Sequence, residues 1–271
     1  KFGVECVLAR SDTGEFLEKL DDGIALALVE PITNPMVRVV DVEEIARRCW
    51  ELGIPLVVDN TFSTPILLNP LKRGAWISLH SLTKYLAGHN DVIGGAIVAG
   101  DRETLRELWN WRRKLGSILS PFDAFLIIRG ISTLEVRFEK QCRSALEIAE
   151  YLVDHPKVEE VYYPGLADSP YKRVADKIFR RRLYGAVLSF RVRGGRREAL
   201  KLLRSLKVIK PAPSLGGVES LLTYPIWSAA KNMDPEQRRE LGITENLLRL
   251  SIGLEDVEDL KEDLGEALSR I

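Results

Sequence analysis

Lys84 lies in the part of the chain whose residue types are best suited to chemistry. A strand-like run at 77–80 ends there, and Ser81, Thr83 and Lys84 follow it closely. Because side chains two apart in an extended segment point the same way, Ser81 and Thr83 can aim both hydroxyls at one anion. With Lys84 turning in beside them, the arrangement suits a phosphate group anchored next to a reactive amine. Taken alone, a Ser-x-Thr-Lys sequence is more often a surface lysine near a turn.

A carboxylate at the end of a short apolar run is the second candidate. Residues 55–58 are apolar, follow a Gly-Ile turn and lead into Asp59. Such a run is typical of a buried parallel strand, and open α/β sheets bind ligands at the carboxyl ends of their strands. An amine, a hydroxyl pair and a buried carboxylate are the groups needed to hold pyridoxal phosphate. Without the lysine context, an Asx turn with Asn60 and Thr61 explains Asp59 equally well.

The composition excludes several classes of protein. The 271 residues suffice for one large domain or two smaller ones. The 39 basic and 39 acidic residues balance, so nothing favours nucleic acid or an anionic membrane as a partner. The three widely spaced cysteines predict neither a disulfide framework nor a metal site, and they fit a reducing cytoplasm. No apolar run approaches the roughly 18 residues of a membrane-spanning helix.

Strand and helix patterns alternate around the candidate residues. Residues 24–29 form an apolar run that predicts a buried strand, followed by a turn-rich loop at 30–35. Asp41 is a predicted helix cap, with Glu44 completing a capping box, and Gly53 ends that helix. Since the strand leading into Asp59 comes next, we predict a βαβ unit and a parallel sheet.

The rest of the chain predicts more helices and strands. Ser120 caps a helix that has Pro121 at its first position and Asp123 completing the box. Further strands are predicted at 92–98, 186–192 and 247–252, and further helices at 102–113, 133–153, 196–206 and 257–268. We place the domain boundary at this helical stretch, which gives domains 1–130 and 131–271.

Six ordered segments resemble the Cys/Met-metabolism family of pyridoxal-phosphate enzymes, which includes cystathionine synthases and lyases, methionine γ-lyase and homoserine sulfhydrylases. They are HSLTKYLAGHND with VDNTFSTP upstream, EPITNP, LSPFDAFLIIRGISTL, VYYPGL, SLGGVESL and LLRLSIGLEDVEDL. The resemblance covers essentially the whole chain. It implies an α/β fold of type I, with a mostly parallel sheet flanked by helices and a smaller C-terminal α+β domain. It also implies that the chain lacks the N-terminal third of the family's sequence.

The resemblance gives each residue near Lys84 a role with pyridoxal 5'-phosphate. Lys84 would carry the cofactor and, once the substrate amine has displaced it, move protons at Cα, at Cβ and on the leaving group. Asp59 would pair with the pyridinium nitrogen of the cofactor. Ser81 and Thr83 would bind its phosphate, although both could be ordinary hydroxyls at a strand end.

Four further residues would bind the substrate. Arg249 lies in an apolar strand, where it would clamp the substrate carboxylate or form an internal salt bridge. Asn34 would lie near that carboxylate, unless it only caps its own turn. Ser214 would line the same pocket. Glu219 would meet the distal ammonium of cystathionine, or else lie at the surface.

The function implied by the resemblance is that of a cytoplasmic lyase or transferase of sulfur amino acid metabolism. We expect α,γ-elimination or γ-replacement in transsulfuration, by a cystathionine γ-lyase or γ-synthase. Methionine γ-lyase and O-acetylhomoserine sulfhydrylase are the alternatives within the family. The expected partners are a small amino-acid substrate and further copies of the chain, in a homotetramer built as a dimer of dimers. A hypothesis of another class is that the chain is an inactive fragment that acts as the assembly partner of a split enzyme.

Overall fold

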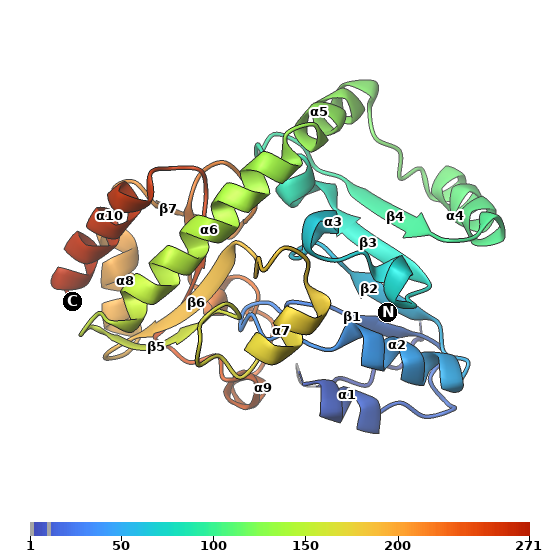
Figure 1. Cartoon of the computed structure of the whole chain (residues 1–271), viewed down its shortest axis with the longest axis horizontal. Helices are drawn as coiled ribbons and strands as arrows, with labels where there is room; N and C mark the ends of the chain where they lie inside the picture. The colour runs from blue at the N-terminus through green and yellow to red at the C-terminus, as the bar shows by residue number, and fades with distance from the viewer. Residues whose placement is uncertain (1–2, 10–11) are drawn as a thin grey trace.

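The structure, a computed structural model, describes residues 3–9 and 12–271 and contains two β-sheets (Figure 1). The first sheet, with strand order β1-β2-β3-β4, comes from residues 27–99. The second, with order β5-β6-β9-β8-β7, comes from residues 158–251. The predicted boundary at residue 130 falls between these two stretches, in the last turn of α5 (Pro121–Ile131) and ahead of the long helix α6 (Leu134–Val153). The division into two domains stays a prediction.

The first sheet is mostly parallel, which confirms the predicted fold class. Strands β1 (Ala27–Val29), β2 (Leu56–Asp59) and β3 (Ile77–Ser81) are parallel, whereas β4 (Gly95–Ala99) pairs antiparallel with β3. The helices of this half are α1 (Thr13–Glu18), α2 (Val42–Glu51), α3 (Thr64–Leu67), α4 (Arg102–Leu115) and α5 (Pro121–Ile131).

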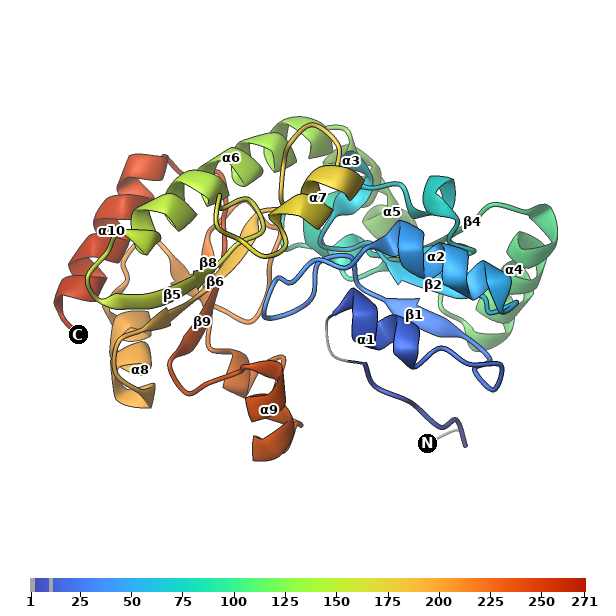
Figure 2. The ribbon, with the colours of Figure 1, turned by 60° about the horizontal axis from the view of Figure 1, so that its bottom comes forward.

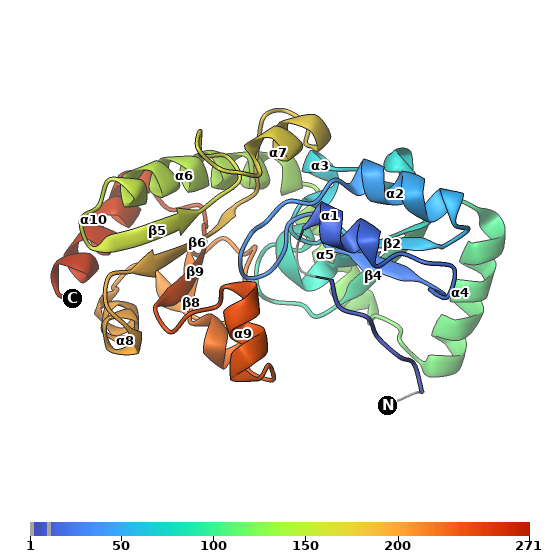
Figure 3. The same ribbon diagram turned by 90° about the horizontal axis from the view of Figure 1, so that it is seen from below.

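The second half is a mixed α+β structure, also as predicted. Its strands are β5 (Val158–Tyr162), β6 (Val187–Val192), β7 (Lys210–Pro211), β8 (Leu221–Thr223) and β9 (Leu247–Ser251), which pair antiparallel except for β7 with β8. Its helices are α7 (Lys172–Ile178), α8 (Arg196–Ser205), α9 (Pro235–Leu241) and α10 (Val257–Ser269). Figure 3 shows α6 and α10 along one side of this sheet and α9 on the other.

The long predicted elements are all present, but several of their ends differ. The run at 24–29 forms only the short strand β1, and the strand predicted at 92–98 begins at Gly95. The sequence patterns did not predict β5, β7, β8, α1, α3 or α9, and the helix face expected at 177–182 coincides with α7 only at its last two residues. Most of these elements are short, so they contain too few turns or alternations to give a clear periodicity.

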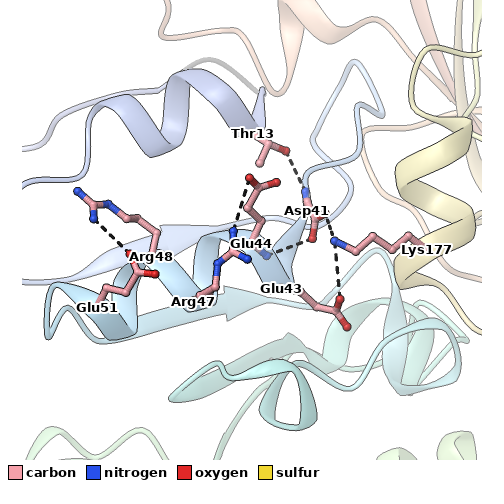
Figure 4. Close-up of polar contacts among 8 residues, drawn as sticks. All are labelled: Thr13, Asp41, Glu43, Glu44, Arg47, Arg48, Glu51 and Lys177. Carbon is pink, nitrogen blue, oxygen red and sulfur yellow. Dashed lines mark hydrogen bonds and ion pairs between the residues drawn. The ribbon is translucent and has the colours of Figure 1, made fainter.

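Helix α2 begins with the predicted cap and is tied to the second half of the chain (Figure 4). Asp41 Oδ1 accepts a hydrogen bond from the Glu44 amide at 3.2 Å. Only this half of the predicted capping box forms among the described residues. Lys177 of α7 donates to Asp41 Oδ2 and lies 3.8 Å from Glu43. These ion pairs fix the start of α2 against α7, and α2 leads directly into β2.

The loop between β1 and α2 also reaches the second sheet, as Figure 2 shows. The carbonyl of Pro35 in this loop accepts a hydrogen bond from Ser189 Oγ of β6 at 2.6 Å. The side chains of Cys49 and Cys142 are buried in the core, as predicted. Within the described ranges, no helix combines the length and the apolar character needed to cross a bilayer.

Candidate active site

Lys84 lies in a helical turn that begins where β3 ends. The turn spans Leu82–Leu86, and Lys84 itself is non-helical, with φ −94° and ψ −131°. Thr83 Oγ1 donates to the Gly94 carbonyl at 3.3 Å and accepts from the Gly94 amide at 3.0 Å. The expectation that Ser81 and Thr83 share one extended segment is therefore wrong, because these bonds to Gly94 hold Thr83 in the turn after the strand.

The turn is held against α6 by Tyr85, the residue that follows Lys84. Tyr85 is fully buried, and its ring packs edge-on against Phe138 of α6, with the two centroids 4.9 Å apart. The carbonyl of Tyr85 accepts a hydrogen bond from Arg137 Nη2 at 3.1 Å, and the same nitrogen donates to the Gly130 carbonyl at 2.7 Å. Arg137 is buried, and these contacts join α5, α6 and the turn. The backbone next to Lys84 is therefore held in place by side chains of α6.

The Lys84 amine meets a hydroxyl from the second half of the chain. Lys84 Nζ donates to Ser214 Oγ at 2.9 Å. Burial lowers the pKa of Lys84, and the positive charge of Arg249 lowers it further. Both effects favour the neutral amine, which is the form that attacks a carbonyl group.

Arg249 of β9 is buried, and its hydrogen-bond partners among the described residues are all neutral. Its side chain is 3% exposed, and Nη1 donates to Asn34 Oδ1 at 2.9 Å. Nη2 donates to the Ser214 carbonyl at 2.9 Å and to Thr223 Oγ1 at 3.2 Å. Burial lowers the pKa of Arg249 to about 10. Among the described residues it forms no salt bridge, so the internal ion pair considered from the sequence is absent and the guanidinium suits a carboxylate ligand.

Asp59 and Ser81 are brought together by Thr61. Asp59 Oδ1 accepts a hydrogen bond from the Thr61 amide at 3.0 Å, so the Asx turn considered from the sequence is formed. Thr61 Oγ1 in turn accepts from the Ser81 amide at 2.8 Å. In the described part of the chain, no group donates a hydrogen bond to Asp59 Oδ2. The turn therefore leaves one carboxylate oxygen at the end of β2 for a ligand.

Glu30 is a residue of this site that the sequence reasoning missed. Its Oε2 accepts a hydrogen bond from the Asn34 amide at 3.1 Å. Burial raises the pKa of Glu30 to about 7, and the negative charge of Asp59 adds to the increase. The signal was available, because Glu30 follows an apolar strand in the same way that Asp59 does.

Glu219 contacts Asn90, which borders the same cavity as the predicted substrate-binding residue Ser214. Its Oε2 accepts from Asn90 Nδ2 at 2.8 Å, and among the described residues no hydrogen bond joins it to Lys84 or Arg249. An open cavity of about 690 Å³ extends between Thr83, Asn90 and Ser214. The structure thus joins Lys84, Ser214, Arg249 and Asn34 by direct hydrogen bonds, and it does not add Glu219 to them.

The residue types of this site fit pyridoxal phosphate. The Lys84 amine has a lowered pKa, Asp59 has a free oxygen, and the buried Nε of Arg249 has no partner among the described groups. Lys84 would hold the aldehyde carbon of the cofactor and Asp59 its ring nitrogen. Ser81 and Thr83 would hold its phosphate. These individual roles stay predictions.

Comparison with known proteins shows the family. The family model described as Cys/Met metabolism PLP-dependent enzyme matches residues 1–269. A cystathionine γ-lyase of Bacillus subtilis is 39% identical over 272 residues, which are 100% of this chain and 71% of that protein. A cystathionine β-lyase of Coxiella burnetii is 40% identical over 259 residues, which are 95% of this chain and 66% of that protein.

A solved structure shows the same relationship. The cystathionine γ-synthase of Xanthomonas oryzae, in complex with aminoacrylate and cysteine, is 43% identical and has a TM-score of 0.88. The match covers 91% of this chain and 63% of that one. The chain thus spans about two thirds of the length of its relatives. Over that length, it belongs to the Cys/Met metabolism family of pyridoxal-phosphate-dependent enzymes.

Proposed function

We propose that this chain carries the catalytic lysine and the substrate clamp of an enzyme that performs α,γ-elimination or γ-replacement on a sulfur amino acid, with cystathionine as the first candidate. One observation carries the proposal. The Lys84 amine lies 2.9 Å from Ser214 Oγ, and the carbonyl of that same serine lies 2.9 Å from the Arg249 guanidinium. A proton-transfer group and a carboxylate-binding group are thus joined through a single residue.

Each residue has a defined task in this proposal. When bound, pyridoxal phosphate withdraws electrons from Cα of the amino acid. Lys84 takes the proton from Cα of the substrate and then moves protons at Cβ and on the leaving group. Ser214 orients the lysine amine by accepting its hydrogen bond. Arg249 binds the α-carboxylate in a bidentate manner, with Asn34 fixing the guanidinium.

The relatives support the substrate class but do not separate the reactions. Relatives named cystathionine γ-lyase, cystathionine β-lyase and L-methionine γ-lyase are between 38% and 40% identical. Such near-equal identities leave methionine γ-lyase and cystathionine β-lyase as alternatives, because small differences in a pocket decide among them. O-acetylhomoserine sulfhydrylase is a further alternative that follows from the family resemblance of the sequence. The hydrogen bond that Glu219 accepts from Asn90 gives no support to Glu219 as the group that selects cystathionine.

Assembly and localisation form part of the same proposal. Large apolar side chains on α4 and α5 are exposed, namely Trp109, Trp111, Phe122, Phe125 and Ile128. An apolar surface of this kind is typical of a subunit interface, which supports a homo-oligomer, a tetramer built from two dimers. All three cysteines are free thiols, which supports a reducing compartment, the cytoplasm.

A second candidate function is that of assembly partner in a split enzyme. Leu28 on β1 and Ile97 on β4, the two edge strands of the first sheet, are 56% and 51% exposed. Because exposed apolar edge strands favour pairing with another chain, a separate polypeptide could complete this sheet. A stable monomer that binds no cofactor would favour this function, and a yellow oligomer would favour the enzyme.

The test is an absorbance spectrum of the purified chain with pyridoxal phosphate, before and after addition of L-cystathionine. We expect a visible band that changes with substrate, followed by release of cysteine, 2-oxobutanoate and ammonia. Release of homocysteine and pyruvate would instead identify a β-lyase. A chain that stays colourless with the cofactor would contradict the enzyme proposal and direct the search to a polypeptide partner.

A further inference from the structure

Glu30 lies between Asp59, at the end of β2, and Asn34, which contacts Arg249. In the first sheet Val29 pairs with Val58, so the next residues, Glu30 and Asp59, follow at the same edge of neighbouring parallel strands. Adjacent paired positions place their side chains on the same side of a sheet. Glu30 Oε2 also accepts the hydrogen bond from the Asn34 amide at 3.1 Å. Glu30 is therefore in contact with the clamp on one side and lies beside Asp59 on the other.

The hydrogen bonds beyond Asn34 lead back to the lysine. Asn34 Oδ1 accepts from Arg249, and the same guanidinium donates to the carbonyl of Ser214, whose hydroxyl accepts from Lys84. A change in the position of Asn34 is thus transmitted to the guanidinium without any contact between Glu30 and the substrate. Glu30 can act on the site only through other residues.

The charges around Glu30 determine which carboxyl holds a proton. Asp59 from β2 is the acidic group that faces Glu30, and the nearest cation along the hydrogen-bonded path, Arg249 of β9, is separated from it by the neutral Asn34. Two carboxylates at one buried edge cannot both ionise without cost, so one of them takes up a proton. Glu30 is desolvated by burial and has no cation partner among the described residues, so it takes up the proton even though the hydrogen bond from the Asn34 amide favours its anion.

We propose that Glu30 is a positioning residue that orients Asn34 in the carboxylate clamp, and that it does so as a protonated carboxyl beside Asp59. The inference rests on the proposed function in one respect, namely that Arg249 and Asn34 bind the substrate carboxylate. The proton and the orientation of Asn34 are properties of the chain without cofactor. Above neutral pH Glu30 loses this proton and the edge of the sheet gains a negative charge.

The proton is tested by thermal unfolding of the cofactor-free full chain between pH 5 and 8. The unfolding midpoint of the wild type should fall relative to that of Glu30→Gln as the pH rises, because only the wild type must lose the proton of Glu30. Asp59→Asn should make this fall smaller and move it to lower pH, because the charge that helps to raise the pKa of Glu30 is gone. Glu240→Gln, at an exposed position, is the matched control and should track the wild type. A constant difference between wild type and Glu30→Gln would overturn the proton assignment.

The orientation of Asn34 is tested by hydrogen exchange of its backbone amide, measured by NMR. Exchange should become faster in Glu30→Ala and stay slow in Glu30→Gln, whose amide oxygen can still accept the hydrogen bond. In the loaded enzyme, Glu30→Ala and Asn34→Ala should each raise the KM for L-cystathionine about tenfold, which corresponds to roughly 1.4 kcal/mol. Unchanged exchange in Glu30→Ala would overturn the positioning role. A loaded wild type without turnover would overturn the proposed function alone, because the unfolding and exchange results do not depend on activity.

Discussion

Lys84 and Ser214 are separated by 130 residues, yet the Nζ of one lies 2.9 Å from the Oγ of the other. The backbone after Ser214 makes this possible. Gly216 has a φ of +80°, and a Cβ atom there would lie 2.7 Å from the amide nitrogen of Tyr85. Gln141 of α6 holds the next residue in place by donating to the Gly217 carbonyl at 2.7 Å. The loop after Ser214 and the turn that carries Lys84 are thus packed backbone to backbone.

Gly216→Ala should therefore destabilise the protein and separate Lys84 from Ser214. The positive φ costs about 1 kcal/mol for any residue with a Cβ, and the collision with the Tyr85 amide adds roughly 1–3 kcal/mol. Gly116→Ala is a matched control, because Gly116 has a φ of +73° but open space around it. Chemical unfolding of both variants measures the difference. Equal losses of stability would show that the close approach to Tyr85 has no energetic weight.

Lys84→Ala should abolish covalent attachment of pyridoxal phosphate. The variant lacks the buried amine with a lowered pKa, so reduction with borohydride should leave no adduct that mass spectrometry can detect. Lys231→Ala, at an exposed lysine, should retain the adduct of the wild type. An adduct of undiminished yield in Lys84→Ala would mean that another lysine is the attachment point.

Arg249→Lys should raise the KM for the amino-acid substrate by about tenfold or more, because an ammonium group cannot form the bidentate contact of a guanidinium. It would also leave Asn34 Oδ1 or Thr223 Oγ1 without its donor. Steady-state kinetics with L-cystathionine measure the effect. Arg113→Lys, at an exposed site on α4, is the control and should behave as the wild type. If both variants show the same KM, the carboxylate clamp lies elsewhere.

Because of Glu30, the free energy of unfolding should decrease as the pH rises from about 4.5 to 7. Its pKa is raised from 4.5 in the unfolded chain to about 7 in the folded one. Between these values the folded state binds more protons, so its stability decreases as the pH rises and is then constant above pH 7. The expected loss is at most about 3.5 kcal/mol, at roughly 1.4 kcal/mol per pKa unit. The measurement is the difference in unfolding free energy between wild type and Glu30→Gln across this range, and a flat difference would contradict it.

The sequence by itself determined the long elements and the chemistry of the site. Helix α2 with its Asp41 cap, and α6 with its long amphipathic pattern, follow from local periodicity and capping. Lys84, Asp59 and Arg249 could be singled out because each places a polar group beside or within an apolar strand, where such a group needs a partner. The family resemblance followed from the order of the same motifs.

Only the tertiary structure decided which of these residues meet. The turn at Thr83 depends on hydrogen bonds to Gly94, and the contact between Lys84 and Ser214 depends on the close approach of Gly216 to Tyr85. Glu219 belonged to the same motif as Ser214, but its partner is Asn90 and not the clamp. The role of Glu30 also needed the strand register, which pairs Val29 with Val58. Local patterns fix each segment's own conformation, whereas contacts between segments depend on how the two sheets and α6 pack, and no short stretch of sequence contains that information.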